Sequence, residues 1–150
     1  MPSSYLSLHY HIIFATKHRQ PLIADDLAPR LHEYLGGIVR GVGGQLLIAG
    51  GIPDHVHLLV RLKATRALSD VVRDVKANSS GWVHDTFPQY AGFGWQTGYA
   101  AFAVSLSGLP DVREYIATQA EHHREMTFED EFVAFLKKHE IEYDERYLWD

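Results

Sequence analysis

The hydrophobic residues of the chain follow two different periods. Four short apolar runs are rich in β-branched and aromatic side chains, as is typical of β-strands: residues 8–16, 45–49, 55–62 and 99–105. Residues 25–42 and 67–83 instead carry apolar side chains every three or four positions, which predicts two amphipathic helices. Residues 87–98 lose this periodicity and gain glycine, so we expect a loop there.

Two more helices are expected after the last strand. Pro110 stands in the first turn of a helix that should run from Leu109 to about Glu125. Thr127 and Asp130 resemble a capping box that begins the last helix. The order β-α-β-β-α-β, followed by two helices, predicts an α+β fold of the ferredoxin-like (RRM-like) type. In this fold an antiparallel four-stranded sheet carries helices on one face, and the first and third strands are neighbours at its centre.

The composition excludes several kinds of chemistry. Residues 1–150 have the length of a single domain and contain no cysteine, which excludes disulfides, thiolate zinc sites and cysteine nucleophiles. The net charge of −5 counts against a broad basic surface for DNA, but allows a few phosphates to be held locally through a metal and some basic side chains. No apolar run approaches membrane-spanning length, and no secretory signal begins the chain, so we expect a soluble cytoplasmic protein.

Candidate chemistry gathers at the start of the third strand. The turn formers Pro53 and Asp54 precede a strongly apolar run. Since side chains two apart in a strand share a face, His55 and His57 should project together, away from the core that Val56 enters. Two imidazoles on one face of a strand are half of a divalent-metal site, or else two ordinary polar residues on a solvated face.

Other residues compete with this pair or could complete it. His9 and His11 form a second His-x-His in the first strand, and spacing alone does not rank the two pairs. Tyr115 and Gln119 lie four apart and so share a face of the third helix; taken alone, they are also ordinary surface positions. The aromatic side chains of the 87–98 loop could stack on unpaired bases or simply pin the loop to the body.

Taken together, these motifs resemble a known family. Asp54-His55-Val56-His57-Leu58-Leu59, followed by Tyr115-Ile116-Ala117-Thr118-Gln119, is similar to the single-tyrosine transposases of the HUH nuclease superfamily, which serve insertion sequences and REP-associated elements. The resemblance extends over nearly the whole chain: residues 10–19 match the first strand of the family, 76–80 its second helix and 98–102 its fourth strand.

The resemblance implies a role for each key residue. His55 and His57 would bind a divalent metal, Mg²⁺ or Mn²⁺, with Gln119 as third protein ligand and Tyr115 as nucleophile. It also ranks this histidine pair above His9 and His11. The substrates of the family are single DNA strands that carry hairpins, and its members are homodimers in which the active site is shared between subunits. The candidate contacts to nucleic acid are Lys17, Arg19, Lys76 and Asn78.

The expected function is therefore a metal-dependent single-strand DNA transposase. It would cleave and rejoin hairpin-bearing ends through a 5′-phosphotyrosine intermediate. One alternative is a REP-associated nuclease of the same chemistry that serves the host. Another is a ferredoxin-like nucleic-acid-binding module without catalysis; such modules present stacking aromatics on the central strands, whereas this chain presents histidines there.

Overall fold

The sheet has the predicted topology. The computed structural model describes residues 3–149, and its four antiparallel strands lie in the order β2-β3-β1-β4. The strands are β1 (His9–Ala15), β2 (Gln45–Ile52), β3 (His55–Arg61) and β4 (Ala100–Val104). The first and third strands are the central pair, so the α+β, ferredoxin-like prediction is confirmed.

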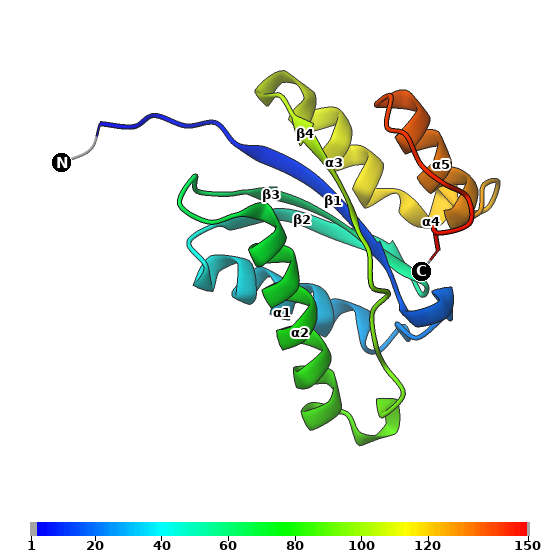
Figure 1. Cartoon of the computed structure of the whole chain (residues 1–150). Coiled ribbons are helices and arrows are strands. Elements are labelled where there is room, and N and C mark those ends of the chain that lie inside the picture. The colour runs from blue at the N-terminus through cyan, green and yellow to red at the C-terminus, as the bar shows by residue number, and fades with distance from the viewer. Residues whose placement is uncertain (1–2, 150) are drawn as a thin grey trace.

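Helices cover both faces of this sheet. The helices α1 (Ala28–Gly41) and α2 (Leu68–Thr86) lie on one face, and α3 (Leu109–Ala117), α4 (Gln119–His122) and α5 (Phe128–Lys138) on the other (Figure 1). Short 3-10 turns precede α1, β4 and α3: η1 (Lys17–Arg19), η2 (Pro88–Tyr90) and η3 (Leu106–Gly108). Among the described residues, no helix is both long enough and apolar enough to cross a membrane.

The prediction of one continuous helix from Leu109 to about Glu125 is wrong. The helix breaks at Thr118, whose φ of −108° and ψ of 27° separate α3 from α4. The Thr118 hydroxyl donates to the carbonyl of Glu114 at 3.0 Å, a local bond of the kind that bends helices. The start of the last helix is as predicted, because the hydroxyl oxygen of Thr127 accepts a hydrogen bond from the Asp130 N–H at 3.1 Å.

The larger core lies between the sheet and the helices α1 and α2. Alternate residues of the two central strands enter it, as a period of two requires. They meet the apolar stripes of both helices, and the main buried contributors are Ile12, Phe14, Leu31, Leu35, Val56, Leu58, Val60, Val71 and Val75.

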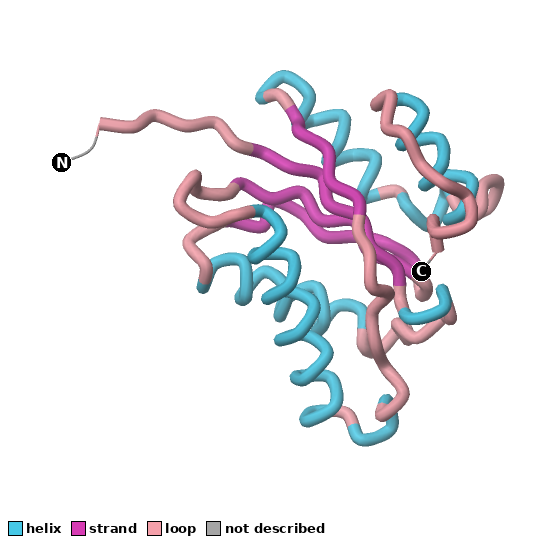
Figure 2. The backbone as a smooth tube through the Cα atoms, viewed as in Figure 1, coloured by secondary structure: helices cyan, strands magenta, loops and turns pink. Residues whose placement is uncertain are grey.

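A smaller core covers the opposite face, where the apolar side of the last helix packs. It contains Ile13, Ala15, Ala100, Phe102, Phe128, Phe132 and Leu136, with Tyr143, Leu148 and Trp149 of the C-terminal segment packed against it. The magenta strands of Figure 2 therefore lie between two layers of helix. His55 and His57 do face away from the first core, but α3, α4 and α5 bury them completely.

Two glycines near the end of β2 allow close contacts on which the site depends. A Cβ atom on Gly50 would lie 2.4 Å from the carbonyl oxygen of Ile116 in α3. A Cβ on Gly51, whose φ is 155°, would lie 2.2 Å from the His55 carbonyl. Both residues belong to β2, which runs three residues past its predicted end at residue 49, so the turn consists of Pro53 and Asp54. The α3 helix can lie this close to its own sheet because residue 50 has no side chain.

The aromatic residues of the 87–98 loop pin it to the body. The ring of Trp95 meets Phe14 edge to face at 4.8 Å, and its indole N–H donates to the hydroxyl of Ser79 at 2.9 Å. Phe93 is also buried in the larger core. Trp95 and Phe93 therefore anchor the loop to the body of the protein, and in this arrangement they do not extend outward to stack on bases.

Candidate active site

Two histidines on β3 point their outer nitrogens into a buried site. Both rings are fully buried, on the face that α3, α4 and α5 cover. Nδ1 of His55 lies 2.7 Å from Oδ1 of Asp54, and Nδ1 of His57 lies 2.8 Å from Nε2 of His11. Each Nδ1 is thus engaged by a second group that fixes the ring, as is usual for histidines that bind metals through Nε2.

The rival histidine pair divides between two environments. Both are buried, but the ring of His11 lies against His57, whereas that of His9 lies 3.5 Å from the hydroxyl of Ser7. Burial lowers the pKa of His11 to about 3 and that of His57 to about 4. Both rings are therefore neutral at pH 7, which is the form that binds metals. In this arrangement His11 supports the pair on β3 and does not replace it.

The C-terminal helices bring three more polar side chains to the histidines. Oε1 of Gln119 lies 3.1 Å from Nε2 of His55 and 3.2 Å from Nε2 of His123. Oε1 of Glu131 lies 2.9 Å from Nε2 of His57 and 3.5 Å from that of His55. One ligand atom from each of His55, His57, His123 and Glu131 lies within 4.8 Å of the others, so this group could hold a metal ion.

The protonation of these side chains favours a cation at their centre. Nδ1 of His123 lies 2.7 Å from the carbonyl oxygen of Met126, so that nitrogen must carry the proton. His55 donates likewise from Nδ1 to the Asp54 carboxylate. A ring that carries a single proton on Nδ1 presents a lone pair at Nε2, and both Nε2 atoms face oxygens of Gln119 and Glu131, which can only accept. Lone pairs that converge without a proton between them are stabilised by a positive ion.

These donors fit a divalent metal. Imidazole nitrogen together with carboxylate and amide oxygen is a mixed set of the kind that transition metals accept, whereas Mg²⁺ prefers oxygen ligands and keeps several waters. The chain offers His55, His57 and the carboxylate of Glu131 as its strongest donors, with Gln119 and His123 beside them.

Tyr115 lies at the edge of the same site. Its hydroxyl donates a hydrogen bond to Oε2 of Glu131, and its ring stacks on His122 with centroids 4.4 Å apart. Burial, assisted by the Glu131 carboxylate, raises the pKa of Tyr115 above its usual value near 10. Tyr115, Glu131 and His11 also line a cavity of about 710 Å³, through which a substrate can reach the hydroxyl.

Glu131 joins the tyrosine to the histidines. Burial by itself would raise the pKa of its carboxyl, but the hydrogen bonds from His57 and Tyr115 outweigh this and lower the pKa to about 2. The side chain is therefore an anion at neutral pH. A single carboxylate thus contacts both the candidate nucleophile and a candidate metal ligand.

The four candidate contacts to nucleic acid have different surroundings. Lys17 and Asn78 are exposed. Arg19 pairs with Glu129 at 3.4 Å and lies over the ring of Trp149 at 5.0 Å. Lys76 donates to the carbonyl oxygens of residues 97 and 98, and burial lowers its pKa to about 8. Two of the four are therefore engaged within the protein.

The sequence contained a signal for one of the two site residues that were not predicted. His123 follows Tyr115 and Gln119 at the same interval of four, so helical periodicity alone could have placed all three on one side. Glu131 carries no such signal, because it is one of three consecutive acidic residues in the first turn of α5. Only the docking of α5 distinguishes it from its neighbours.

Comparison with known proteins gives one consistent family. The family model described as "Transposase IS200 like" matches residues 4–119. The ISDra2 transposase TnpA of Deinococcus radiodurans is 28% identical over 117 residues, which cover 75% of this chain and 84% of that protein. The crystal structure of a Deinococcus radiodurans R1 protein described as a transposase aligns with a TM-score of 0.62 and 28% identity, over 79% of this chain and 96% of that one.

A second solved structure shares the fold. A REP-associated tyrosine transposase bound to a REP hairpin aligns with a TM-score of 0.60, over 82% of this chain and 74% of that one. Its sequence identity is 13%, so this likeness concerns the fold alone. The family match over residues 4–119 includes both β3 histidines, Tyr115 and Gln119. The chain therefore belongs to the IS200-like transposase family and is a tyrosine transposase of the HUH superfamily.

Proposed function

We propose that the chain is a metal-dependent transposase and endonuclease for single-stranded DNA, in which residues 1–150 act as one domain. Tyr115 is the nucleophile, and His55, His57 and Gln119 hold the metal. The observation that carries this proposal is the position of Glu131, whose two oxygens contact the Tyr115 hydroxyl and Nε2 of His57. Nucleophile and metal ligands therefore share one buried site.

The reaction exchanges one phosphodiester for another. The Tyr115 oxygen attacks the scissile phosphorus, and the bond from phosphorus to the 3′ oxygen breaks. The upstream strand leaves with a 3′-OH, which retains the proton lost by tyrosine, and the downstream strand stays on Tyr115 through its 5′ phosphate. A second 3′-OH can reverse the step and regenerate the tyrosine hydroxyl. No ATP is needed, because each step makes one bond and breaks another of similar energy.

A bound Mg²⁺ or Mn²⁺ would supply charge neutralisation and orientation at the scissile phosphate. The protein residues have separate tasks around it. His55 and His57 are fixed from behind by Asp54 and His11, and Glu131 holds the tyrosine hydroxyl in the cavity. A tyrosine whose pKa is raised needs this help to act near neutral pH.

We also propose that the substrate is a single strand that carries a hairpin. Two observations support this: the fold is shared with a transposase bound to a REP hairpin, and the net charge of −5 gives weak attraction for duplex of arbitrary sequence. The hairpin-bearing strand should therefore bind more tightly than random duplex at the same salt concentration.

The homodimer with a shared active site is likewise a proposal that rests on the family resemblance. In the single chain described here, α3 packs on its own β2 and Tyr115 reaches the Glu131 of its own chain. A shared site therefore requires α3 to leave Gly50 and dock on the second subunit, with the η3 turn before it as the hinge.

Covalent trapping tests the proposed chemistry. Wild-type protein, Mn²⁺ and an oligonucleotide with a hairpin and a single-stranded flank should give a protein–DNA adduct, which mass spectrometry locates on Tyr115. Tyr115→Phe removes one oxygen and should abolish the adduct. Tyr99→Phe is the matched control, since Tyr99 is 38% exposed and lies outside the site. An adduct on any other tyrosine, or one that persists in Tyr115→Phe, refutes the assignment.

A further inference from the structure

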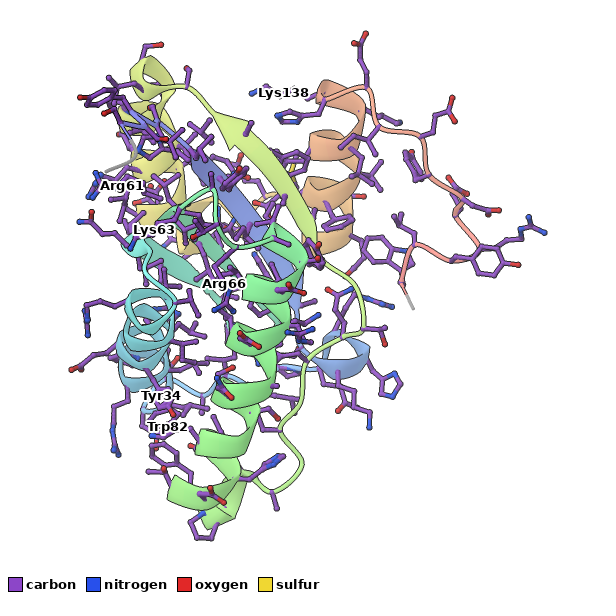
Figure 3. All side chains as sticks on the ribbon, turned by 60° about the vertical axis from the view of Figure 1, so that its left-hand side comes forward. Tyr34, Arg61, Lys63, Arg66, Trp82 and Lys138 are labelled. Carbon is purple, nitrogen blue, oxygen red and sulfur yellow. The ribbon has the colours of Figure 1, made fainter. Side chains whose placement is uncertain are left out.

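A group of basic and aromatic side chains comes from α1, α2 and the segment after β3. The sheet separates α1 and α2 from α3, α4 and α5, which cover the candidate active site (Figure 1). We call this group the basic-aromatic band, and its members are Arg30, Tyr34, Arg40, Lys63 and Trp82. In Figure 3, Tyr34 and Trp82 lie next to each other on the two helices, with Lys63 on the same side of the molecule.

The aromatic members of the band are stacked. The rings of Tyr34 and Trp82 lie 4.4 Å apart at an angle of 19°. The Arg30 guanidinium lies 4.7 Å from the ring of Phe87 and 5.9 Å from that of Trp82. A cavity of about 390 Å³ opens between Arg30, Tyr34, Arg40, Trp82 and the acidic Glu33. This volume lies within the range of small-ligand sites, which begins at about 300 Å³. The stack is half-buried, and aromatic rings beside arginines are the side chains with which proteins hold unpaired bases.

The three cations of the band form no ion pair in the described part of the chain, although Glu33 lines the same cavity as Arg30 and Arg40. Among residues 3–149, Arg30, Arg40 and Lys63 have no carboxylate within ion-pair distance, although Arg66 and Arg73 on the same side pair with aspartates of α2. Lys63 extends along the end of α1, because a Cβ on Gly43 would lie 3.2 Å from its Nζ. The band therefore follows α1 from its first turn to its end.

Basic and acidic residues are distributed unevenly along the chain. Residues 1–100 hold nine Lys and Arg against seven Asp and Glu, whereas residues 101–150 hold five against twelve. The acidic excess therefore belongs to the helices that cover the active site and to the C-terminal segment after α5. A polyanion would meet less repulsion on the side of α1 and α2.

Glycines keep the helix surface open beside the band. Gly41 in α1 and Gly81 in α2 have no atom within 4 Å of the position that a Cβ would take. Glycine inside a helix costs about 1 kcal/mol relative to alanine, and no contact within the chain requires it at these two positions. The absent side chains leave room for another chain to approach the backbone.

We propose that the basic-aromatic band is a second binding site for single-stranded DNA. Arg30, Arg40 and Lys63 contact phosphates, and a base extends the stack on Tyr34. The 14 residues of α1 span about 20 Å, along which a strand in helical form presents roughly six phosphates. This inference rests on the proposed function, because it takes DNA to be the substrate. Because the sheet lies between band and Tyr115, the band holds a part of the strand distant from the cleaved bond.

The salt dependence of DNA binding tests this site independently of DNA cleavage. A labelled single strand of about 30 nucleotides is titrated in EDTA by fluorescence anisotropy between about 50 and 200 mM salt. In Arg30→Gln/Arg40→Gln, two phosphate contacts are lost, and the slope of log K against log salt should fall in size by about 1.4. Tyr34→Ala should weaken binding by about tenfold with an unchanged slope.

The control variant loses the same number of positive charges on a different part of the surface. Lys137→Gln/Arg146→Gln removes two exposed cations from the acidic C-terminal part and should leave the slope as in wild type. An equal slope in Arg30→Gln/Arg40→Gln and wild type overturns the inference. So does a change in sedimentation mass without a change in DNA affinity, which would assign the band to a protein contact.

The proposed function is judged separately, by the wild-type adduct on Tyr115. If no adduct forms but the band variants still reduce the slope, the proposed chemistry fails and the binding site stands. If the adduct forms and the slope is unchanged, the chemistry stands and the binding site fails.

Discussion

Replacing Glu131 with glutamine should destabilise the metal-free protein. The side chain is 2% exposed and accepts hydrogen bonds from His57 and Tyr115, while glutamine keeps its shape and loses its charge. Together these contacts lower the pKa of the carboxyl from 4.5 to about 2. At 1.36 kcal/mol per pKa unit, the free energy of unfolding should fall by about 3 kcal/mol at pH 7. For a chain of this length, the melting temperature falls by roughly 6–12 °C.

The effect has a defined pH dependence. A carboxyl whose pKa is lower in the folded protein contributes stability that is complete above the unfolded pKa of 4.5. That contribution is lost as the pH falls through the folded pKa of about 2. The difference between wild type and Glu131→Gln should therefore be constant from pH 7 to about 5 and shrink to about half at pH 3.

Thermal melts in EDTA at several pH values measure this difference. Glu129→Gln is the matched control on the same helix, since Glu129 is 44% exposed and its pair with Arg19 should contribute less than about 1 kcal/mol. Equal melting temperatures of wild type and Glu131→Gln at pH 7 would refute the buried-carboxylate argument. A difference that stays unchanged down to pH 3 would show that shape, rather than charge, is what the variant alters.

Three further predictions concern the helix, the metal and the assembly. Gly50→Ala forces its Cβ against the Ile116 carbonyl, so it should cost about 1–3 kcal/mol of stability, whereas Gly81→Ala, with open space around it, should not destabilise; melts of both variants decide this. His57→Ala should weaken Mn²⁺ binding at least tenfold by calorimetry and lower the melting temperature as well, because the ring is fully buried; unchanged affinity would exclude it as a ligand. A mixture of His57→Ala and Tyr115→Phe should regain cleavage if subunits share sites, and a mixture that stays inactive with heterodimers present would rule sharing out.

The period of two along β3 made half of the site predictable. Alternation sends Val56 and Leu58 to one face and the two histidines to the other, and no tertiary information is needed for that. The role of His11 was not predictable in the same way, because it depends on pairing. In the observed register Ile13 lies opposite His57, which makes His11 a diagonal neighbour of His57 on the same face.

The half of the site that comes from helices depends on how α4 and α5 pack against the sheet. No local sequence pattern indicates that packing. Thr118 interrupts a stretch whose apolar spacing reads as one helix, and the interruption lets α4 turn Gln119 and His123 towards β3. Glu131 enters only because the apolar side of α5 closes on the second core. A local sequence pattern predicts which side chains share a face of a helix. It does not predict which polar side chain on that face will contact another element of the fold.

The alternation of β3 also links the fidelity of folding to catalysis. A slip of one residue against β1 would exchange the faces of the strand, sending His55 and His57 among the aliphatic side chains and Val56 into the metal site. A molecule with the shifted register would bury unpaired imidazoles and also lack its metal ligands. A preparation that contains such molecules would show substoichiometric Mn²⁺ uptake, so the number of ions bound per chain counts the correctly paired fraction.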